Sequence, residues 1–321
     1  MPEYMPMTSP DRLGRPTFDV VVVGAASRDI AADDPRGWRL GGGVTYSALT
    51  TARLGLRTAA LIGLDDVAAD ADELELLRAS AVEIRPHRLE QGPVFENIER
   101  PEGRLQIAHS PSDPVPPEAV PHGWATTSAW ILAPVAAELP DGWASLPTTE
   151  AIVAVGWQGL LRSLTAGEEV RHVAPGPTRV IKRADLVGVS RDDLGPGTEL
   201  AELCRALRPG ATLAVTQGRS GGVVLEAGPD GPVRIRHYPA TASGPVVDAT
   251  GAGDVFLAAL AAARAVPQLV GGRIGQGFDL LLAAAAASLV LEAHGLHGVP
   301  DRDAVRRRMA EALERARATR A

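Results

Sequence analysis

The residues with the clearest chemical potential lie in one stretch near the C-terminus, Pro245-Val-Val-Asp-Ala-Thr-Gly-Ala-Gly-Asp254, which leads into an Ala- and Leu-rich helix expected over 252–265. Glycines let the backbone approach a ligand closely and adopt positive φ angles. The helix that follows directs free N–H groups and the positive end of its dipole at that ligand. The stretch therefore predicts an anion-binding loop.

Asp254 stands in the first turn of this helix. A helix cap is the plainer interpretation, but Asp248 and Thr250 already occupy positions where a cap can form. A carboxylate beside an anion site is electrostatically unfavourable unless it does chemistry, such as accepting the proton of an attacking hydroxyl group. The sequence therefore predicts a catalytic base at Asp254.

Other phosphate-binding motifs do not occur. The P-loop pattern G-x-x-x-x-G-K-[ST] is absent, and Lys182 is the only lysine of the chain. The segment Gly24-Ala-Ala-Ser-Arg-Asp29, which follows the first expected strand, lacks the G-x-G-x-x-G spacing of dinucleotide-binding proteins.

The residues Asp248 to Asp254 resemble the C-terminal signature D-x-T-G-A-G-D of the ribokinase-like (PfkB) carbohydrate kinases at all six specified positions. A second family feature, a glycine pair that opens a helix ending in Leu-Gly, fits Gly42–Gly43 and Leu54–Gly55. The resemblance covers Val20 to about Met309. It implies an α/β, ribokinase-like fold: a doubly wound, mainly parallel sheet flanked by helices, with a reduced β-lid.

The resemblance also implies ATP-dependent phosphorylation of a small hydroxylated substrate with Mg²⁺. Asp254 matches the family's base, and the backbone amides of Gly251, Ala252 and Gly253 match its anion hole. On the acceptor side, Asp29, Gly42 and Gly43 match the sugar-contacting positions. Asp248 matches the position that holds a monovalent cation such as K⁺ in many relatives.

Two positions depart from the family pattern. Tyr46 stands where the family has an Asn that reads substrate hydroxyls, so it either contacts a different substrate or packs in the core. Ser190 and Asp193 stand at the Asn and Glu of the metal-linked N-x-x-E motif. Asp193 would hold Mg²⁺ through water, and a helix cap is the alternative for Ser190.

The resemblance also implies a donor side. The family's nucleotide-side strand and turn resemble Thr216, Gly218 and Gly221, and relatives cover the adenine at the position of His294; a hairpin turn and a structural histidine are the alternatives.

A substrate contact is expected from Asn97, which alternates with Phe95 and Glu99 on one face of the lid hairpin. Substrate contacts are also expected from Gln158 and Arg162, because the carboxyl ends of parallel strands form the binding edge of open α/β sheets. Gln158 and Arg162 also resemble a Q-G-x-x-R pattern of the myo-inositol kinase-like branch; an ordinary loop and an exposed arginine are the alternatives.

Strands and helices alternate along most of the chain, which predicts the parallel sheet. Residues 1–17 are expected to form a flexible tail and 18–321 a single kinase domain, with 94–108 as a partial lid hairpin apart from the main sheet. Only eleven residues, Ile30 to Leu40, are available where relatives place another lid segment, so we expect no lid strands there. A short helix is expected at Val135–Leu139.

Composition excludes several classes of protein. The chain has 321 residues, 45% hydrophobic and 22% charged, and a net charge of −7, which argues against a nucleic-acid backbone as the main partner. One cysteine, Cys204, excludes an intrachain disulfide or a cysteine metal cluster. Neither a membrane-spanning run nor a signal peptide is expected, so we predict a cytoplasmic monomer or homodimer without a membrane partner.

The sequence thus predicts a kinase for a small sugar or polyol, with a cyclitol such as myo-inositol favoured. A nucleoside or vitamin-precursor kinase of the same fold is the alternative among enzymes. A catalytically inactive ligand-binding regulator is the alternative outside enzymes, supported by the altered positions Ser190 and Asp193.

Overall fold

A nine-stranded sheet forms the centre of the molecule, with strand order β16-β15-β14-β13-β9-β8-β1-β4-β5. The computed structural model describes residues 17–100, 103–195 and 197–318. The strands of this sheet are β1 (Phe18–Ala25), β4 (Thr58–Leu64), β5 (Glu83–Arg88), β8 (Thr127–Leu132), β9 (Ile152–Gly156), β13 (Leu186–Ser190), β14 (Thr212–Thr216), β15 (Gly222–Ala227) and β16 (Pro232–Tyr238). Neighbouring strands are parallel, except that β15 is antiparallel to both β14 and β16. The predicted fold class, a doubly wound and mainly parallel sheet, is confirmed.

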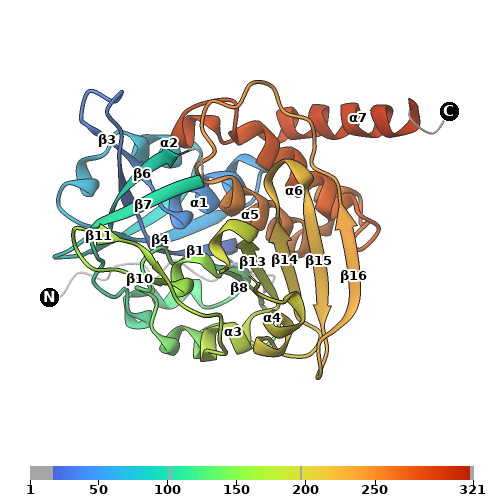
Figure 1. Cartoon of the computed structure of the whole chain (residues 1–321), viewed down its shortest axis with the longest axis horizontal. Helices are drawn as coiled ribbons and strands as arrows, with labels where there is room; N and C mark the ends of the chain where they lie inside the picture. The colour runs from blue at the N-terminus through green and yellow to red at the C-terminus, as the bar shows by residue number, and fades with distance from the viewer. Residues whose placement is uncertain (1–16, 101–102, 196, 319–321) are drawn as a thin grey trace, which may run out of the picture.

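Helices cover both faces of the sheet, as Figure 1 shows. The described residues form the α-helices α1 (Gly43–Arg53), α2 (Glu73–Ala79), α3 (Arg179–Arg183), α4 (Leu200–Ala206), α5 (Ala252–Ala265), α6 (Phe278–Val290) and α7 (Arg302–Ala318). Helices α1, α2, α5, α6 and α7 pack on one face, and α3 and α4 on the other. Because both faces are covered, the central strand β1 is an unbroken apolar run, with Val20 to Val23 fully buried.

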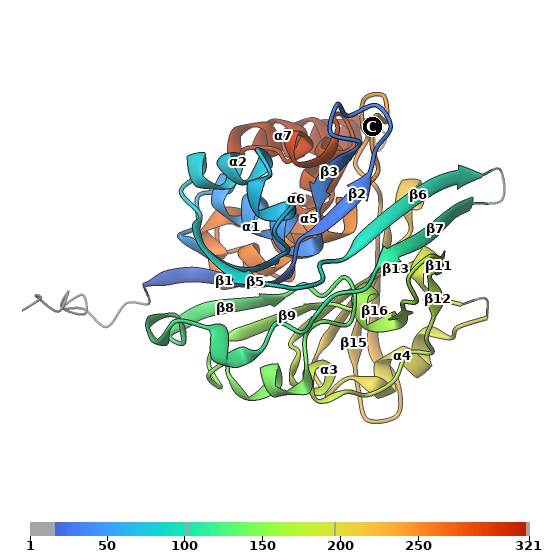
Figure 2. The same cartoon turned by 90° about the vertical axis from the view of Figure 1, so that its left-hand side faces the viewer.

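A second sheet stands apart from the main one, in the order β11-β7-β6-β2-β3. Its strands are β2 (Ser27–Ile30), β3 (Trp38–Gly41), β6 (Val94–Arg100), β7 (Gly103–Ser110) and β11 (Glu168–Glu169), and the β6–β7 hairpin extends beyond the body in Figure 2. The predicted hairpin is confirmed. The expectation that no lid strands lie between Ile30 and Leu40 is wrong, because β2 and β3 pair there and β2 continues the sheet beside β6.

The first lid hairpin, β2–β3, is fastened to the body by charged side chains. Arg36 at its tip donates to both Glu73 oxygens at 2.8 and 2.6 Å, and Arg28 pairs with Asp65 at 2.8 Å. Both guanidinium groups also lie over the ring of Trp38, at 4.7 and 5.9 Å from its centroid. These contacts explain how so short a connection forms a stable part of the lid sheet.

The expected helix at Val135–Leu139 is wrong. This segment is an irregular loop in which Ala137 has φ of 57° and the carboxylate of Glu138 collects backbone amides. Glu138, 2% exposed, accepts hydrogen bonds from the amides of Ala25 at 2.9 Å, Val135 at 3.1 Å and Ala136 at 2.8 Å. The side chain thus gives these three amides an acceptor, and it joins the end of β1 to the loop that follows β8.

Replacing Glu138 with Ala is expected to lower the free energy of unfolding by about 3 kcal/mol or more, because several buried amides lose their acceptor at once. Glu138→Gln keeps one acceptor oxygen and should lose less. Urea denaturation of the two variants and the wild type measures both losses. Equal stability of Glu138→Ala and wild type would contradict this role.

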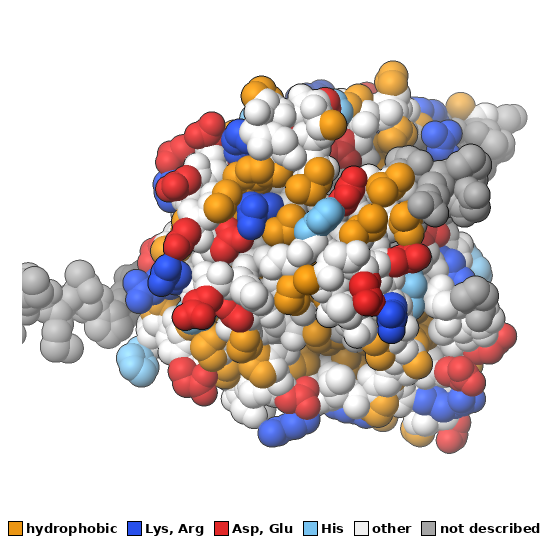
Figure 3. Space-filling model, turned by 60° about the vertical axis from the view of Figure 1, so that its left-hand side comes forward, with side chains coloured by type: hydrophobic (Ala, Val, Ile, Leu, Met, Phe, Trp, Pro, Cys, Tyr) orange, Lys and Arg blue, Asp and Glu red, His pale blue; other side chains and the backbone are white. Residues whose placement is uncertain are grey.

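The described part of the chain contains no helix that is both long and apolar enough to cross a membrane. On the face drawn in Figure 3, acidic and basic side chains are interspersed, and this face has no continuous basic surface of the kind that a nucleic-acid backbone needs. The predicted N-terminal tail, residues 1–17, lies outside the described residues apart from Thr17. Strands β10 (Arg162–Ser163) and β12 (Arg171–His172) pair with each other and form a small third sheet near the lid.

Candidate active site

The predicted anion-binding loop meets the first turn of α5. Gly251 is the N-cap residue of this helix, with φ of 78° and ψ of −2°, a left-handed conformation that favours glycine. The amides of Ala252, Gly253 and Asp254 lie in the first turn, where no earlier carbonyl of the helix can accept them. A Cβ on Gly253 would meet no atom within 4 Å, so the backbone is open to a ligand here.

Asp254 lies where the N-terminal ends of two helices meet. A Cβ placed on Gly43, the first residue of α1, would come within 2.7 Å of Oδ1 of Asp254, so only glycine allows this approach. The side chain is partly buried and keeps an accessible surface. Burial and the neighbouring charge of Asp193 raise the pKa of Asp254 to about 7, against the charge of Arg162, which lowers it. A carboxyl with this pKa is suited to accept a proton near neutral pH.

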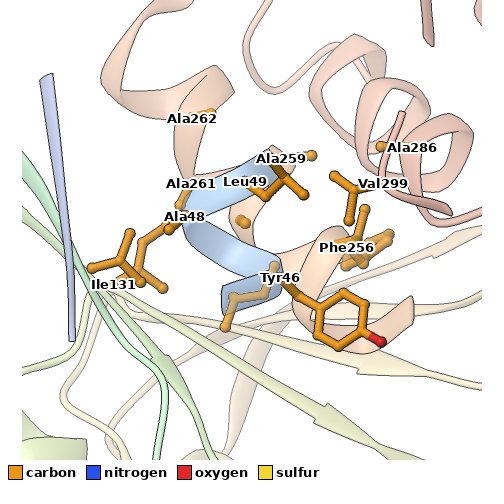
Figure 4. Close-up of a cluster of buried hydrophobic side chains, with 14 of the residues drawn as sticks. Tyr46, Ala48, Leu49, Ile131, Phe256, Ala259, Ala261, Ala262, Ala286 and Val299 are labelled. Atoms are coloured by element: carbon orange, nitrogen blue, oxygen red, sulfur yellow. The ribbon is translucent and has the colours of Figure 1, made fainter. Parts of the chain in front are cut away.

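The ring of Tyr46 packs against the glycine loop at Gly251. It is 2% exposed and lies in the core cluster of α1 and α5, and Figure 4 shows its hydroxyl directed away from the apolar side chains around it. A Cβ on Gly251 would overlap the Tyr46 ring. The ring therefore fills the space beside the loop, and its hydroxyl comes within 3.9 Å of a Cβ built on Gly295. Packing explains Tyr46 in this arrangement; a substrate contact through the hydroxyl stays a prediction.

Replacing Gly251 with Ala is expected to lower the free energy of unfolding by about 2–4 kcal/mol, from left-handed strain and from overpacking against Tyr46. Turnover should fall as well, because the first-turn amides move with the loop.

Gly277→Ala is the matched control. Gly277 caps α6 with φ of 90°, and a Cβ there would meet no atom within 4 Å. Strain without a clash should cost about 1–2 kcal/mol and leave turnover unchanged. Thermal unfolding and steady-state kinetics of the two variants separate the effects, and equal losses in both would contradict the packing of Tyr46 under Gly251.

The predicted acceptor residue Asp29 lies on β2 of the lid sheet. Ser27 Oγ donates to its Oδ1 at 2.9 Å, and the charge of Asp29 raises the pKa values of Asp254 and Tyr46. Arg39 lies directly opposite Asp29 on β3, and its positive charge lowers the pKa of Tyr46. Sequence reasoning missed Arg39, although the even spacing of Arg39 and Gly41 in a strand already puts both on one face.

Gln158, Arg162 and Asp193 come together at the carboxyl ends of the adjacent parallel strands β9 and β13. Gln158 Nε2 donates to Asp193 Oδ1 at 2.8 Å, and a guanidinium nitrogen of Arg162 lies 3.6 Å from the same oxygen. Arg162 also lies over the ring of Phe95 from the lid strand β6, 5.7 Å from its centroid. Asp29, Asp193, Asp254 and Arg162 interact electrostatically, so the charged residues predicted for the acceptor and catalytic positions form one cluster.

This cluster contains more negative than positive charge, since three carboxylates surround one guanidinium. Among the described residues, no three Asp, Glu, His or Cys side chains gather closely enough to hold a metal ion alone. Mg²⁺ keeps several water or phosphate ligands, so one carboxylate, Asp193, fits its binding. Mg²⁺ bound there would neutralise charge on the donor phosphates. The Ser190 hydroxyl accepts the Asp192 amide at 3.2 Å as a cap, and its place beside Mg²⁺ stays a prediction.

Asp248 fastens the glycine loop to the segment after α6. Its Oδ1 accepts the amide of Thr250 at 2.8 Å and its Oδ2 accepts the amide of Gly295 at 3.0 Å. Both oxygens thus already hold the loop without the predicted K⁺, whose binding stays a prediction. His294 is exposed at this junction, where a positive charge on its ring lowers the pKa values of Asp248 and of Asp33 in the lid.

The predicted donor-side residues lie at the ends of β14 and β15. Thr216 ends β14 and pairs with Gly222, and Gly218 is exposed with open space around it. Gly221 is different: it is buried, and a Cβ would overlap the carbonyl oxygen of Tyr238. Packing against β16 therefore accounts for this glycine without a ligand. Asn97, on β6, accepts a hydrogen bond from Gln106 at 2.8 Å across the lid hairpin.

Comparison with known proteins agrees with this geometry. The family model "pfkB family carbohydrate kinase" matches residues 168–302, which include Asp193 and the glycine loop. No curated protein matches the chain in sequence.

Several solved structures share the fold. A pyrophosphate-dependent kinase in the ribokinase family, complexed with a pyrophosphate analog and myo-inositol, is 19% identical, with a TM-score of 0.68 and 90% and 99% of the two chains covered. Ribokinase of Arabidopsis thaliana, complexed with ribose and ATP, is 17% identical, with a TM-score of 0.63 and coverage of 91% and 98%. The nucleoside kinase of Methanocaldococcus jannaschii is 16% identical, with a TM-score of 0.63 and coverage of 91% and 98%. The predicted resemblance is confirmed: the chain has the ribokinase-like fold, and its residues 168–302 match the pfkB family carbohydrate kinase model.

Proposed function

We propose that this protein is a phosphotransferase that moves the terminal phosphoryl group of ATP to a hydroxyl group of a small sugar or polyol. The position of Asp254 carries the proposal. Its carboxylate lies beside the free amides of the α5 first turn and within electrostatic reach of Asp29 on the acceptor side. A base, an anion-binding loop and an acceptor carboxylate are thus in one place.

In the proposed reaction, the hydroxyl oxygen of the acceptor bonds to the phosphorus while the bond from phosphorus to the bridging donor oxygen breaks. Asp254 accepts the hydroxyl proton, and the amides of Ala252 and Gly253 donate hydrogen bonds to the phosphoryl oxygens. Such a transfer needs positioning and charge stabilisation more than covalent assistance. Asp29 would orient the acceptor.

ATP is the proposed donor because an apolar surface adjoins the glycine loop. Val246 and Val247, just before Asp248, are 45% and 46% exposed, and the amide of Val247 donates to the carbonyl of Leu291 at 2.7 Å. An adenine ring can pack on such side chains, whereas pyrophosphate has no apolar part that would contact them. Pyrophosphate is the second candidate, because similar solved structures include kinases that use it.

A cyclitol such as myo-inositol is the proposed acceptor. The Tyr46 ring occupies space where the family has a smaller Asn, and Asp29 and Arg39 offer polar groups to several hydroxyls. A rigid ring rich in hydroxyl groups loses little entropy on binding such a site. The similar kinases that bind or phosphorylate myo-inositol support this choice, and the similar nucleoside kinase supports the alternative of a nucleoside acceptor.

The test measures phosphorylation of myo-inositol, ribose, fructose, adenosine and cytidine at matched concentrations, with ATP and with pyrophosphate as donor. We expect the highest kcat/KM for myo-inositol with ATP. A nucleoside that exceeds the cyclitol about tenfold would overturn the polyol proposal. Binding of these compounds without turnover by either donor would favour the inactive regulator instead.

A further inference from the structure

Arg162 has an unusual environment for a guanidinium group. Its side chain is only 9% exposed, and its Nε has no hydrogen-bond partner. Its contact with Asp193, at 3.6 Å, is longer than a good hydrogen bond. Burial lowers the pKa of Arg162, and only the carboxylates of Asp193, Asp254 and Asp29 oppose this effect.

Buried polar groups in folded proteins nearly always have hydrogen-bond partners, and an exception indicates a ligand or ordered water. A guanidinium carries five N–H donors in a planar fork that matches the oxygens of a phosphoryl group. The ring of Phe95, on the lid strand β6, covers one side of the guanidinium, with 5.7 Å between Cζ of Arg162 and the ring centroid. Gln158 already donates to Asp193 at 2.8 Å, so this carboxylate remains partnered when Arg162 turns to a ligand.

We propose that Arg162 binds an oxygen of the phosphoryl group that is transferred, opposite the first-turn amides of α5. Phosphoryl binding exchanges the long contact with Asp193 for charge-assisted hydrogen bonds. Arg162 keeps its proton throughout and moves no group itself. The proposal rests on the proposed function for its role in turnover, but not for anion binding, which can be measured without any reaction.

Anion binding is tested by calorimetric titration of wild type, Arg162→Met and Arg162→Lys with inorganic pyrophosphate and with a non-hydrolysable ATP analogue. Loss of a charge-assisted bond to phosphate should weaken binding at least about tenfold in Arg162→Met and less in Arg162→Lys. Titration with myo-inositol distinguishes the two sides of the site. We expect this affinity to change less than threefold, because the acceptor carries no oxyanion.

Arg264→Met is the matched control. The Nε of Arg264 is also buried without a hydrogen-bond partner, but this residue lies in the last turn of α5, at the opposite end of the helix from Asp254. Both Met variants lose an arginine with such an Nε, so a loss of anion binding in Arg162→Met alone assigns the effect to the site. Binding within threefold of wild type in Arg162→Met, or equal losses in both variants, would overturn the proposal.

Turnover supplies a second readout. Loss of a donor to the phosphoryl oxygens should lower kcat about 100-fold or more in Arg162→Ala, and added guanidinium ion should restore part of it. A loss confined to the acceptor KM would contradict the proposal and assign Arg162 to the acceptor. If the wild type transfers phosphate to none of the acceptors, the proposed function fails, and the titrations still decide whether Arg162 binds the oxyanion.

Discussion

Replacing Asp254 with Asn is expected to lower kcat at least about 100-fold, because a positioned base contributes on this scale and Asn cannot accept the hydroxyl proton. The affinity for the ATP analogue should stay within a few-fold, since the amides of the α5 first turn are unchanged. Steady-state kinetics and calorimetric titration measure the two quantities. A kcat close to that of the wild type would sink the assignment of Asp254 as base.

The variant must also fold, and the pKa of Asp254 predicts the direction of the effect. The folded-state pKa, about 7, lies above the ordinary value of 3.8, so the ionised carboxylate lowers the free energy of unfolding. This loss of stability is complete above about pH 7, decreases as the pH falls, and is absent below about pH 4. Asn carries no charge, so the Tm of Asp254→Asn at pH 8 should equal or exceed that of the wild type. Asp279→Asn is the matched control: it removes another buried aspartate in the first turn of a helix, α6, and should leave kcat unchanged.

The pH dependence of kcat/KM is expected to show an acid limb near pH 7. Asp254 is active as the carboxylate, and its pKa of about 7 arises mainly from burial, with Asp193 and Asp29 raising it and Arg162 lowering it. Between pH 7 and pH 5 the ionised fraction falls about 50-fold, and kcat/KM should fall with it. The decrease should be reversible, since Asp254 becomes more compatible with the folded state when it is protonated.

The measurement uses a non-titrating buffer series from pH 5 to pH 9, with acceptor concentrations below KM. The residual activity of Asp254→Asn provides the control and should be nearly independent of pH over this range. An acid limb near pH 4 in the wild type would contradict the burial of this carboxylate. A limb near pH 7 that persists in Asp254→Asn would assign the titration to another group, such as the donor phosphates.

Much of the fold could be predicted from local patterns. The apolar run of β1 and the glycine loop before α5 are short-range signals, and both lie where they were expected. The Glu138 loop could not be predicted, because the amide of Ala25 that helps to hold it is distant in the sequence. The β2–β3 hairpin was missed for a related reason: Arg36 and Glu73, which fasten it, are 37 residues apart.

The site residues also include some that local sequence patterns predict and some that they miss. Asp254, Asp29 and Asp193 follow from motif positions, and Gln158 and Arg162 from their places at a strand end. The structure brings these residues into one cluster. Arg39 and Phe95 were missed because their relation to the cluster depends on strand register in the lid sheet. Gly221 shows a different limit of motif reasoning: the structure gives a packing reason for this glycine, since a Cβ would overlap the backbone of Tyr238, and its contact with a ligand stays a prediction.

In the proposed reaction, Asp254 deprotonates a polyol hydroxyl, and this hydroxyl oxygen receives the terminal phosphoryl group. The most direct measurement follows labelled phosphate from ATP to myo-inositol, with the product separated and identified as a phosphomonoester by mass spectrometry. We expect a labelled inositol phosphate with the wild type and at most about 1% of that rate with Asp254→Asn. Absence of any labelled phosphomonoester with sugars, polyols or nucleosides, from either ATP or pyrophosphate, would contradict the proposed reaction.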